Sequence, residues 1–374
     1  MRLLVHFFLF LLLASGQSLA ALDSTPPPPA KEISEKVSTR LGELRTLTDA
    51  KNYPAALALT DRLLADAATE SYDAFVLSQV KAQVLLAQNR YDDALAPLEA
   101  SLHLADAHPY LDARPKLDLV YLLAQVTAQL ASAAKDSAAQ QILFGRAYAF
   151  IHRWLAETPA PTPDARLFAA SVHYNHAQAA TPADPMQFDV ALAEAEEGLT
   201  LSIRPSEQFY VLMLASLQHL GDLARAADLL ELLVAQHPVT VSYWQQLAST
   251  YLNLAATAKD DRSVRHQQLR AVLTYERAQR QNYLNTPADL FNLSGLYFNL
   301  GQYNECIALL ETNRVGLLAD DRRALELLIR AYQLSHDDAR ALASAEQALA
   351  RFPEDATFAA TLARLRLAVK SSRP

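Results

Sequence analysis

Apolar residues recur along most of this chain at the spacing of one helix face. In the segment VSYWQQLASTY, residues 241–251, four positions stand at i, i+3, i+4 and i+7: Trp244, Leu247, Ala248 and Tyr251. This spacing places all four on the same side of an α-helix. The small Ala248 would let a second helix approach closely, and the two large rings would fill the space toward a neighbouring pair of helices.

The same pattern returns in three other segments. First-helix positions are Tyr210, Met213, Leu214 and Leu217 in 207–240, Leu290, Leu293, Ser294 and Tyr297 in 287–320, and Leu325, Leu328, Ile329 and Tyr332 in 322–355. The second helix of each of the four segments carries a small residue: Ala226, Ala271, Cys306 and Ala341. No alternating strand-like run bounded by turns is apparent in the sequence, and with only 8 glycines in 374 residues the composition favours helix.

This order of residues resembles the tetratricopeptide repeat (TPR), which has a period of about 34 residues. The resemblance implies an all-α fold, a TPR-like α-solenoid of stacked helical hairpins. Residues 356–370 predict a C-terminal capping helix that covers the last apolar face. Repeats and capping helix together are predicted to span 165–374.

The N-terminal part, 32–157, predicts more divergent helical repeats. Segments 51–64 and 89–102 keep the repeat spacing, whereas 110–157 predicts a long helical hairpin. Pro97 falls inside a predicted helix and should bend it or shift its start. The sequence TPAPTPD, 158–164, predicts a proline-rich break that divides the chain into two arms.

The first twenty residues have the pattern of a secretory signal peptide. Arg2 precedes an apolar run from Leu3 to Ala14, and Ser18-Leu19-Ala20 forms a small-residue cleavage site. We expect export to the periplasm and a mature chain that begins at Ala21, followed by a stiff proline-rich spacer over 21–31. The alternative is an uncleaved anchor, although the apolar run is short for a membrane span.

The acidic balance of the chain gives no sign of nucleic-acid binding. Its formal net charge is −8, whereas nucleic-acid binding proteins concentrate Lys and Arg. One segment is locally basic: about eleven extra residues, 256–266, interrupt the repeat period and include Lys259, Arg262, Arg265 and His266. Two interpretations stay open for this insertion, a longer solvated helix end or a docking surface.

Residues 241–355 also resemble a narrower family. The phrases SYWQQLASTYLNL, AVLTYERAQRQNYLNTPADLFNLSGLYFNLGQYNECIALLE and RALELLIRAYQLSHDDARALASAEQALARFPED are similar to exported TPR proteins associated with bacterial TonB–ExbB–ExbD systems. This resemblance implies a periplasmic accessory protein of an outer-membrane uptake apparatus, with envelope transport components as partners. It carries over no catalytic residue.

Residues that could carry catalytic or metal chemistry have structural interpretations. His173 and His176 lie at i, i+3 without further ligands fixed by spacing, so we expect polar helix surface. Cys306 takes the place of a small buried residue and should be structural. The acid pairs Asp92-Asp93, Asp320-Asp321 and Asp337-Asp338 are expected at helix starts, where carboxylates cap free N–H groups. We therefore expect no enzyme activity, no metal and no cofactor.

Two function classes remain: a protein-binding scaffold, and a helical periplasmic enzyme or ligand carrier with a pocket between the two arms. For the scaffold, places 2, 5, 9 and 12 of each first helix are expected to line a concave face, as the TPR resemblance implies. Partner-binding candidates are Gln245, Leu252, Phe291, Gly295, Phe298, Arg323 and Arg330. We expect a partner segment on the two phenylalanines, its carboxylates bound by arginines that flank them. The alternative is a repeat phase off by one place, or rings covered by another turn of the solenoid.

Overall fold

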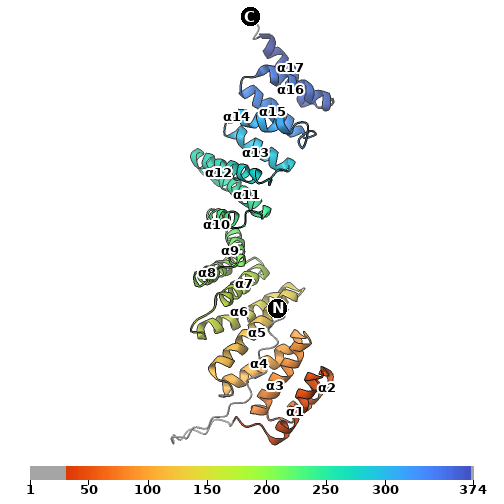
Figure 1. Ribbon diagram of the computed structural model, residues 1–374, viewed down its shortest axis with the longest axis vertical. Coiled ribbons are helices and arrows are strands. Elements are labelled where there is room, and N and C mark those ends of the chain that lie inside the picture. Colours follow the sequence, from red (N-terminus) through yellow and green to blue (C-terminus); the bar gives the residue numbers. More distant parts are fainter. Residues whose placement is uncertain (1–30, 372–374) are drawn as a thin grey trace. The chain divides into compact units, whose positions relative to one another are not determined.

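The computed structural model describes residues 31–371, with side chains through Leu367. The predicted signal peptide 1–20 and residues 21–30 of the predicted spacer lie outside the described residues. Seventeen helices and no strand occur in the described part of the chain (Figure 1).

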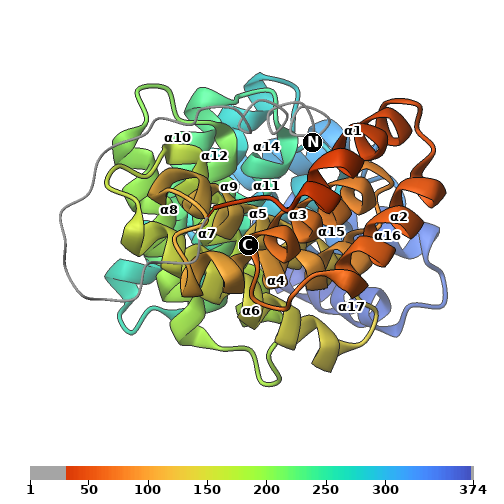
Figure 2. The same cartoon turned by 90° about the horizontal axis from the view of Figure 1, so that it is seen from below.

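The chain divides into two compact units, with the boundary between Ser216 and Leu217. The helices that lie within or begin in the first unit are α1 Glu35–Asp49, α2 Tyr53–Asp66, α3 Tyr72–Ala87, α4 Tyr91–Ala107, α5 Ala113–Ala133, α6 Ser137–Glu157, α7 Pro163–Ala179, α8 Pro185–Leu201 and α9 Glu207–Leu220. The division thus falls inside α9. Consecutive helices from α1 to α8 pack on one another as a series of hairpins, and α1 to α4 can be followed side by side in Figures 1 and 2.

The second unit continues the hairpins. It contains α10 Leu223–Gln236, α11 Val241–Thr257, α12 Asp261–Arg280, α13 Pro287–Asn299, α14 Tyr303–Asn313, α15 Arg322–Leu334, α16 Asp338–Arg351 and α17 Ala356–Ser371. Each helix packs on the next, and α13 also contacts α15 directly. The predicted all-α TPR-like solenoid with a closing helix is confirmed.

The small residues decide where the second helices sit. Ala226, Ala271, Cys306 and Ala341 are each 0% exposed, which fixes the predicted repeat phase. The predicted closing helix α17 packs Phe358, with Leu362 and Leu365, on the core of the second unit. The long hairpin predicted over 110–157 is α5 and α6, and Pro97 lies inside α4 as predicted.

Short polar side chains set the helix starts. Asp321 and Asp337 cap α15 and α16 by accepting hydrogen bonds from backbone N–H groups, as expected from the acid pairs. Thr286 and Asp289 form a reciprocal capping box at α13. Asp92 and Asp93 lie in the first turn of α4 but are not its cap.

A repeated hydrogen bond crosses the repeat boundaries of the second unit. The phenol of Tyr251 donates to Glu231 at 2.9 Å, Tyr297 to Glu276 at 2.8 Å and Tyr332 to Glu311 at 2.8 Å, and in α17 the guanidinium of Arg366 bonds Glu346 at 3.0 Å. We call these four pairs the Tyr–Glu ladder. In each, a glutamate on a second helix meets the first helix of the following repeat. Burial, and then the adjacent carboxylate, raises the pKa of Tyr332 to about 12.

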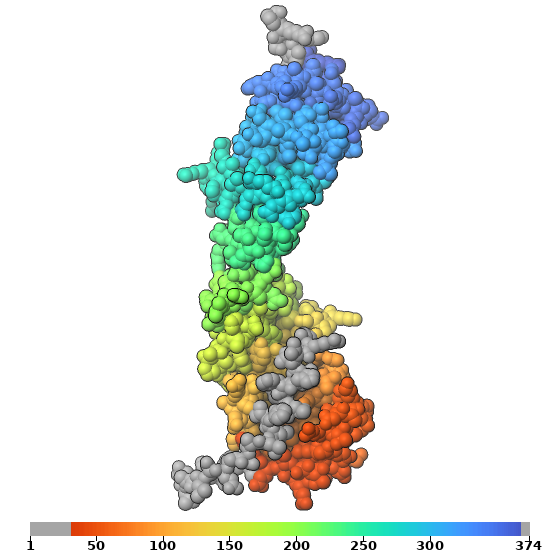
Figure 3. Space-filling view, in the orientation of Figure 1, coloured from red at the N-terminus to blue at the C-terminus, as the bar shows by residue number. Residues whose placement is uncertain are grey.

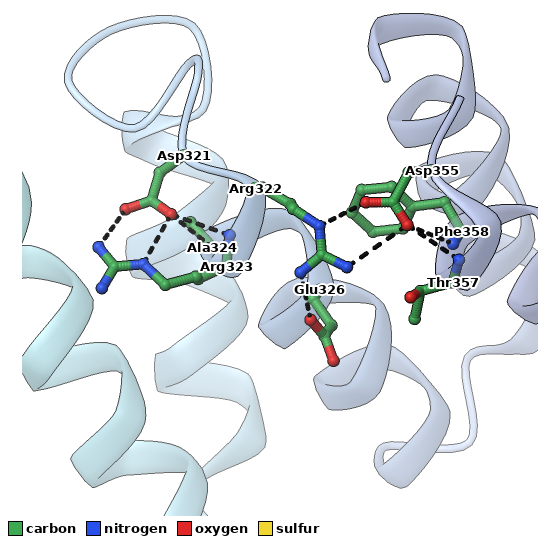
Figure 4. Close-up of polar contacts among 8 residues, drawn as sticks. All are labelled: Asp321, Arg322, Arg323, Ala324, Glu326, Asp355, Thr357 and Phe358. Atoms are coloured by element: carbon green, nitrogen blue, oxygen red, sulfur yellow. Dashed lines mark hydrogen bonds and ion pairs between the residues drawn. The ribbon is translucent and has the colours of Figure 1, made fainter. Parts of the chain in front are cut away.

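Arg322 fastens α17 to α15. Its guanidinium binds both carboxylate oxygens of Asp355, contacts Glu326 at 3.2 Å, and lies 5.2 Å from the centre of the Phe358 ring (Figure 4). Asp355 also accepts hydrogen bonds from the N–H groups of Thr357 and Phe358. The Arg322 hydrogen bond is the largest cause that lowers the pKa of Asp355, to about 2.

The insertion at 256–266 is built as longer helices. It extends the end of α11 and the start of α12, with Asp260 as the cap of α12. Lys259, Arg262, Arg265 and His266 are all exposed. In the space-filling view the teal surface of this hairpin projects on the left beyond the blue hairpins that follow it (Figure 3).

The predicted break at 158–164 connects two helices of the first unit. It contains the turn between α6 and α7 and the first residues of α7, with Thr162 as cap. Pro163 at the first position of α7 has a fixed φ that suits a helix start. The proline-rich segment therefore ends one helix and begins the next.

Candidate functional site

The candidate site begins with one face of α13. Phe291, Gly295 and Phe298 stand at i, i+4 and i+7 and therefore lie on the same side of this helix. Both rings are half-buried, because one side of each packs on the core of the second unit. Gly295 between them faces open space: a Cβ atom there would meet nothing within 4 Å.

Two arginines of α15 lie on these rings. The guanidinium carbon of Arg323 is 4.6 Å from the centre of the Phe291 ring, and that of Arg330 is 5.3 Å from the centre of the Phe298 ring. Both distances are typical of cation–π contacts. The structure thus brings together five of the seven predicted residues, which we call the aromatic–arginine strip: Phe291, Gly295, Phe298, Arg323 and Arg330.

The contacts refine the expectation that the arginines flank the rings. Arg323 and Arg330 are the second and ninth residues of α15, and they lie over the fifth and twelfth residues of α13, Phe291 and Phe298. Each guanidinium therefore covers part of a ring face. This cover belongs to side chains of the adjacent repeat. The rings are therefore neither core residues nor freely exposed.

The two arginines differ in their charge partners. Arg323 is paired with the carboxylate of Asp321, at 3.3 Å from Nε and 3.0 Å from Nη2 (Figure 4). The Asp321 hydrogen bond is the largest cause that raises the pKa of Arg323. Arg330 is exposed, and no carboxylate of the described residues lies within ion-pair distance of it.

The other two predicted residues lie on α11. Gln245 is exposed and Leu252 is half-buried, seven residues further along the same face. No hydrogen bond, ion pair or ring contact of the described residues joins either of them to the aromatic–arginine strip. They occupy the corresponding places of the preceding repeat.

The comparisons with known proteins concern the helical repeat. No protein-family model matches the chain, and none of the curated proteins does. The chain is similar to a solved thermophilic TPR protein of Thermus thermophilus, at 20% identity and a TM-score of 0.30, over 55% of this chain and 100% of that one. It is also similar to a TPR protein of Parabacteroides merdae, at 10% identity and a TM-score of 0.39, over 80% and 99% of the two chains.

A third similarity is to the TPR domain of P58(IPK), at 14% identity and a TM-score of 0.26, over 90% of this chain and 99% of that one. Identities and TM-scores this low assign no function. The description of the chain as a TPR-like solenoid rests on its own hairpins and on the small residues between them.

The interpretation of His173 as polar helix surface is wrong. Its side chain is 2% exposed, lies with its ring centre 4.9 Å from that of Tyr148, and its Nδ1 is 2.9 Å from Oε1 of Gln187. The face of α7 that carries His173 packs on α6 and α8, and the buried Ala169, Ala170 and Ala177 lie on the same face. Burial is the largest cause that lowers the pKa of His173; the nearby His152 and His176 also lower it, whereas the Gln187 hydrogen bond and Glu194 oppose the shift.

We expect acid to destabilise the first unit through His173. Because the unfolded chain has a histidine pKa of about 6.5 and the folded pKa is lower, the unfolded state binds more protons below pH 6.5. The free energy of unfolding should fall with pH there, by at most about 1.4 kcal/mol per pH unit for this group. Urea unfolding at several pH values between 7.5 and 5 measures this pH dependence of the free energy of unfolding. His173→Gln should flatten the dependence, and an unchanged slope in that variant would contradict the assignment.

Other parts of the described chain add little chemistry. Cys306 is buried, and burial raises the pKa of its thiol to about 12. Within the described residues no group of three or more His, Cys, Asp and Glu side chains could hold a metal ion. None of the described helices is both long enough and apolar enough to cross a membrane. A shallow hollow of about 430 Å³ lies between α14, α15 and α16, with Glu311 and Tyr332 in its wall.

Proposed function

We propose that this chain is a non-catalytic protein-binding scaffold whose aromatic–arginine strip receives a segment of a partner protein. The observation that carries the proposal is the pair of Phe–Arg stacks on two adjacent first helices. Aromatic and arginine side chains are enriched among the residues that dominate binding energy. Open space at Gly295 lets another chain approach the helix between the two rings.

The stacked arrangement suits binding because it is organised in advance. A guanidinium that rests on a ring face loses less conformational freedom when a ligand arrives, and its N–H groups point along the plane toward incoming acceptors. Arg330 has such a stack on Phe298 and no carboxylate partner among the described residues. A partner segment with an apolar side chain and a carboxylate fits this combination.

Removal of both rings tests the scaffold proposal. Phe291→Ala with Phe298→Ala should weaken binding of the partner that co-purifies with the wild-type chain at least tenfold, on the scale of hot-spot losses. Titration calorimetry measures the affinity, and circular dichroism checks the fold. If the double variant unfolds, the rings serve the core; if it folds and binds as the wild type does, the site assignment is wrong.

A matched control is available in the loop between α14 and α15. Val315 is 91% exposed and Leu317 is 54% exposed, so Val315→Ala with Leu317→Ala removes two apolar side chains of the same unit that lie outside the strip. This control should keep its affinity. A loss equal to that of the ring variant would point to a general apolar effect instead of the strip.

The finer proposal places the scaffold in the periplasm, accessory to a TonB-dependent uptake system. Two observations support it: the signal-peptide pattern of residues 1–20 and the resemblance of 241–355 to exported TPR proteins of such systems. Neighbouring genes for ExbB-, ExbD- or TonB-like proteins would support the uptake role.

N-terminal sequencing of the protein from the envelope fraction tests export. We expect Ala21 as the first residue, because small residues at Ser18 and Ala20 mark the cleavage site. An intact Met1 on a soluble cytoplasmic species would reject export.

A further inference from the structure

The carboxylate of Asp321 is fully engaged. Oδ1 accepts hydrogen bonds from the backbone N–H of Arg323 at 2.9 Å, from that of Ala324 at 3.3 Å, and from Arg323 Nε at 3.3 Å, while Oδ2 accepts from Arg323 Nη2 at 3.0 Å. Its side chain is only 16% exposed. The Arg323 hydrogen bond is the largest cause that lowers the pKa of Asp321, so the group stays ionised.

This arrangement uses one of the two edges through which the Arg323 guanidinium can bind a carboxylate. Nε and one Nη form the fork that binds a carboxylate through two parallel hydrogen bonds, and Asp321 already fills that fork (Figure 4). One face of the guanidinium rests on Phe291. Arg330 has the same kind of stack on Phe298 but no such internal partner among the described residues.

We propose that the carboxylate of Asp321 takes the place at Arg323 where a partner's carboxylate would bind. The aromatic–arginine strip therefore accepts a partner segment with a single carboxylate, which binds at Arg330. The inference rests on the proposed function and names the selectivity of the same site. A partner with two acidic residues in register gains little from the second one, because Asp321 already fills the Nε–Nη2 edge of Arg323 and offsets its charge.

The helix geometry defines which acidic pair is in register. Arg323 and Arg330 are seven residues apart on α15, a rise of about 10.5 Å at 1.5 Å per residue. An extended peptide in the polyproline II conformation advances about 3.1 Å per residue and has three residues per turn, so every third side chain points to the same side. Two carboxylates three residues apart in a polyproline II segment therefore point to the same side, about 9.3 Å apart, close to the spacing of the two arginines.

The test uses Asp321→Asn, which keeps a good helix cap while it removes the charge. The probes are two acetylated nine-residue peptides of Gly, Ser and Leu, one with a single Glu and one with two Glu residues three positions apart. In the wild type the two-Glu peptide should bind no more than about twofold more tightly, the statistical factor for two equivalent carboxylates. In Asp321→Asn its advantage should rise to about tenfold, the scale of one freed charge-assisted pair.

Asp337→Asn is the matched control. Asp337 caps the next helix, α16, and lies 3.5 Å from Arg340, so this variant removes a capping charge outside the strip. Its two peptide affinities should keep the wild-type ratio. A tenfold preference for the two-Glu peptide already in the wild type, or an unchanged ratio in Asp321→Asn, would overturn the inference.

A second readout needs no peptide. Modification of arginines by p-hydroxyphenylglyoxal, mapped by mass spectrometry, should label Arg330 faster than Arg323 in the wild type and both at similar rates in Asp321→Asn. Equal labelling rates in the wild type would overturn the inference. If the peptides bind but Phe291→Ala with Phe298→Ala does not weaken them, the proposed function fails instead, so the two failures are distinguishable.

Discussion

Trp244→Ala is expected to lower the free energy of unfolding of the second unit by about 3–5 kcal/mol, the usual range for removal of a buried large ring. The indole is 2% exposed and packs beside Leu247 and Tyr251 within α11. Its Nε1 donates a hydrogen bond to the Pro238 carbonyl at 2.9 Å. The guanidinium of Arg277 lies 5.2 Å from the ring centre. Alanine would leave a cavity, an unpaired carbonyl and an arginine without its stack.

The measurement needs a probe that does not depend on Trp244 itself. Cys306 is the single cysteine of the chain and is buried in α14, so thiol labelling in increasing urea reports opening of the second unit. Trp244→Phe keeps a ring but removes the N–H group, and it should cost about 1 kcal/mol for that hydrogen bond plus a smaller packing loss. A change near zero for Trp244→Ala would show that the repeat phase is wrong.

Gly198→Ala should destabilise the first unit by about 1–3 kcal/mol, the usual range for overpacking. A Cβ atom at Gly198 in α8 would lie 2.6 Å from the ring of Phe209 and 2.8 Å from Cβ of Arg166. Neither neighbour can retreat easily: Phe209 is 1% exposed, and Arg166 is held by Glu194 at 2.7 Å and Glu197 at 2.6 Å. Close approach of the helices here requires glycine.

Gly42→Ala should have the opposite effect on the stability of the first unit. Gly42 is also helical, in α1, but a Cβ atom there would meet nothing within 4 Å. Alanine should therefore raise the free energy of unfolding of the first unit by about 0.5–1 kcal/mol, because alanine has the higher helix propensity. Trp154 fluorescence in a Trp244→Phe background follows the first unit alone. Equal effects of the two alanines would contradict the steric explanation for Gly198.

The repeat architecture was predictable because it depends on few residues. Ala226, Ala271, Cys306 and Ala341 recur at the one place where two helices of a hairpin come closest, and any larger side chain would separate them. Their spacing therefore determined the phase of all four hairpins. It also identified Phe291 and Phe298 as residues on one face of α13.

Contacts between repeats were harder to predict. The sequence placed Arg323 and Arg330 near the rings, but the offset of α15 against α13 decides that the guanidinium groups lie on the ring faces. The Tyr–Glu ladder was missed although a signal exists: Glu231 and its three counterparts each follow the small residue by five positions. Near His173 a signal also exists: Ala169, Ala170 and Ala177 are each 0% exposed and lie three or four residues from His173, so they mark the inner face of α7.

The Tyr–Glu ladder changes its chemistry at its last member. The first three pairs join a neutral phenol to a carboxylate, and ionic strength has little effect on such hydrogen bonds. Arg366–Glu346 is an ion pair with both side chains about half exposed, and Arg322–Asp355, which also holds α17, is a second one. Salt screens exposed charge pairs. We therefore expect rising ionic strength to weaken the Arg366–Glu346 pair and so to loosen the contact of α17 with α16.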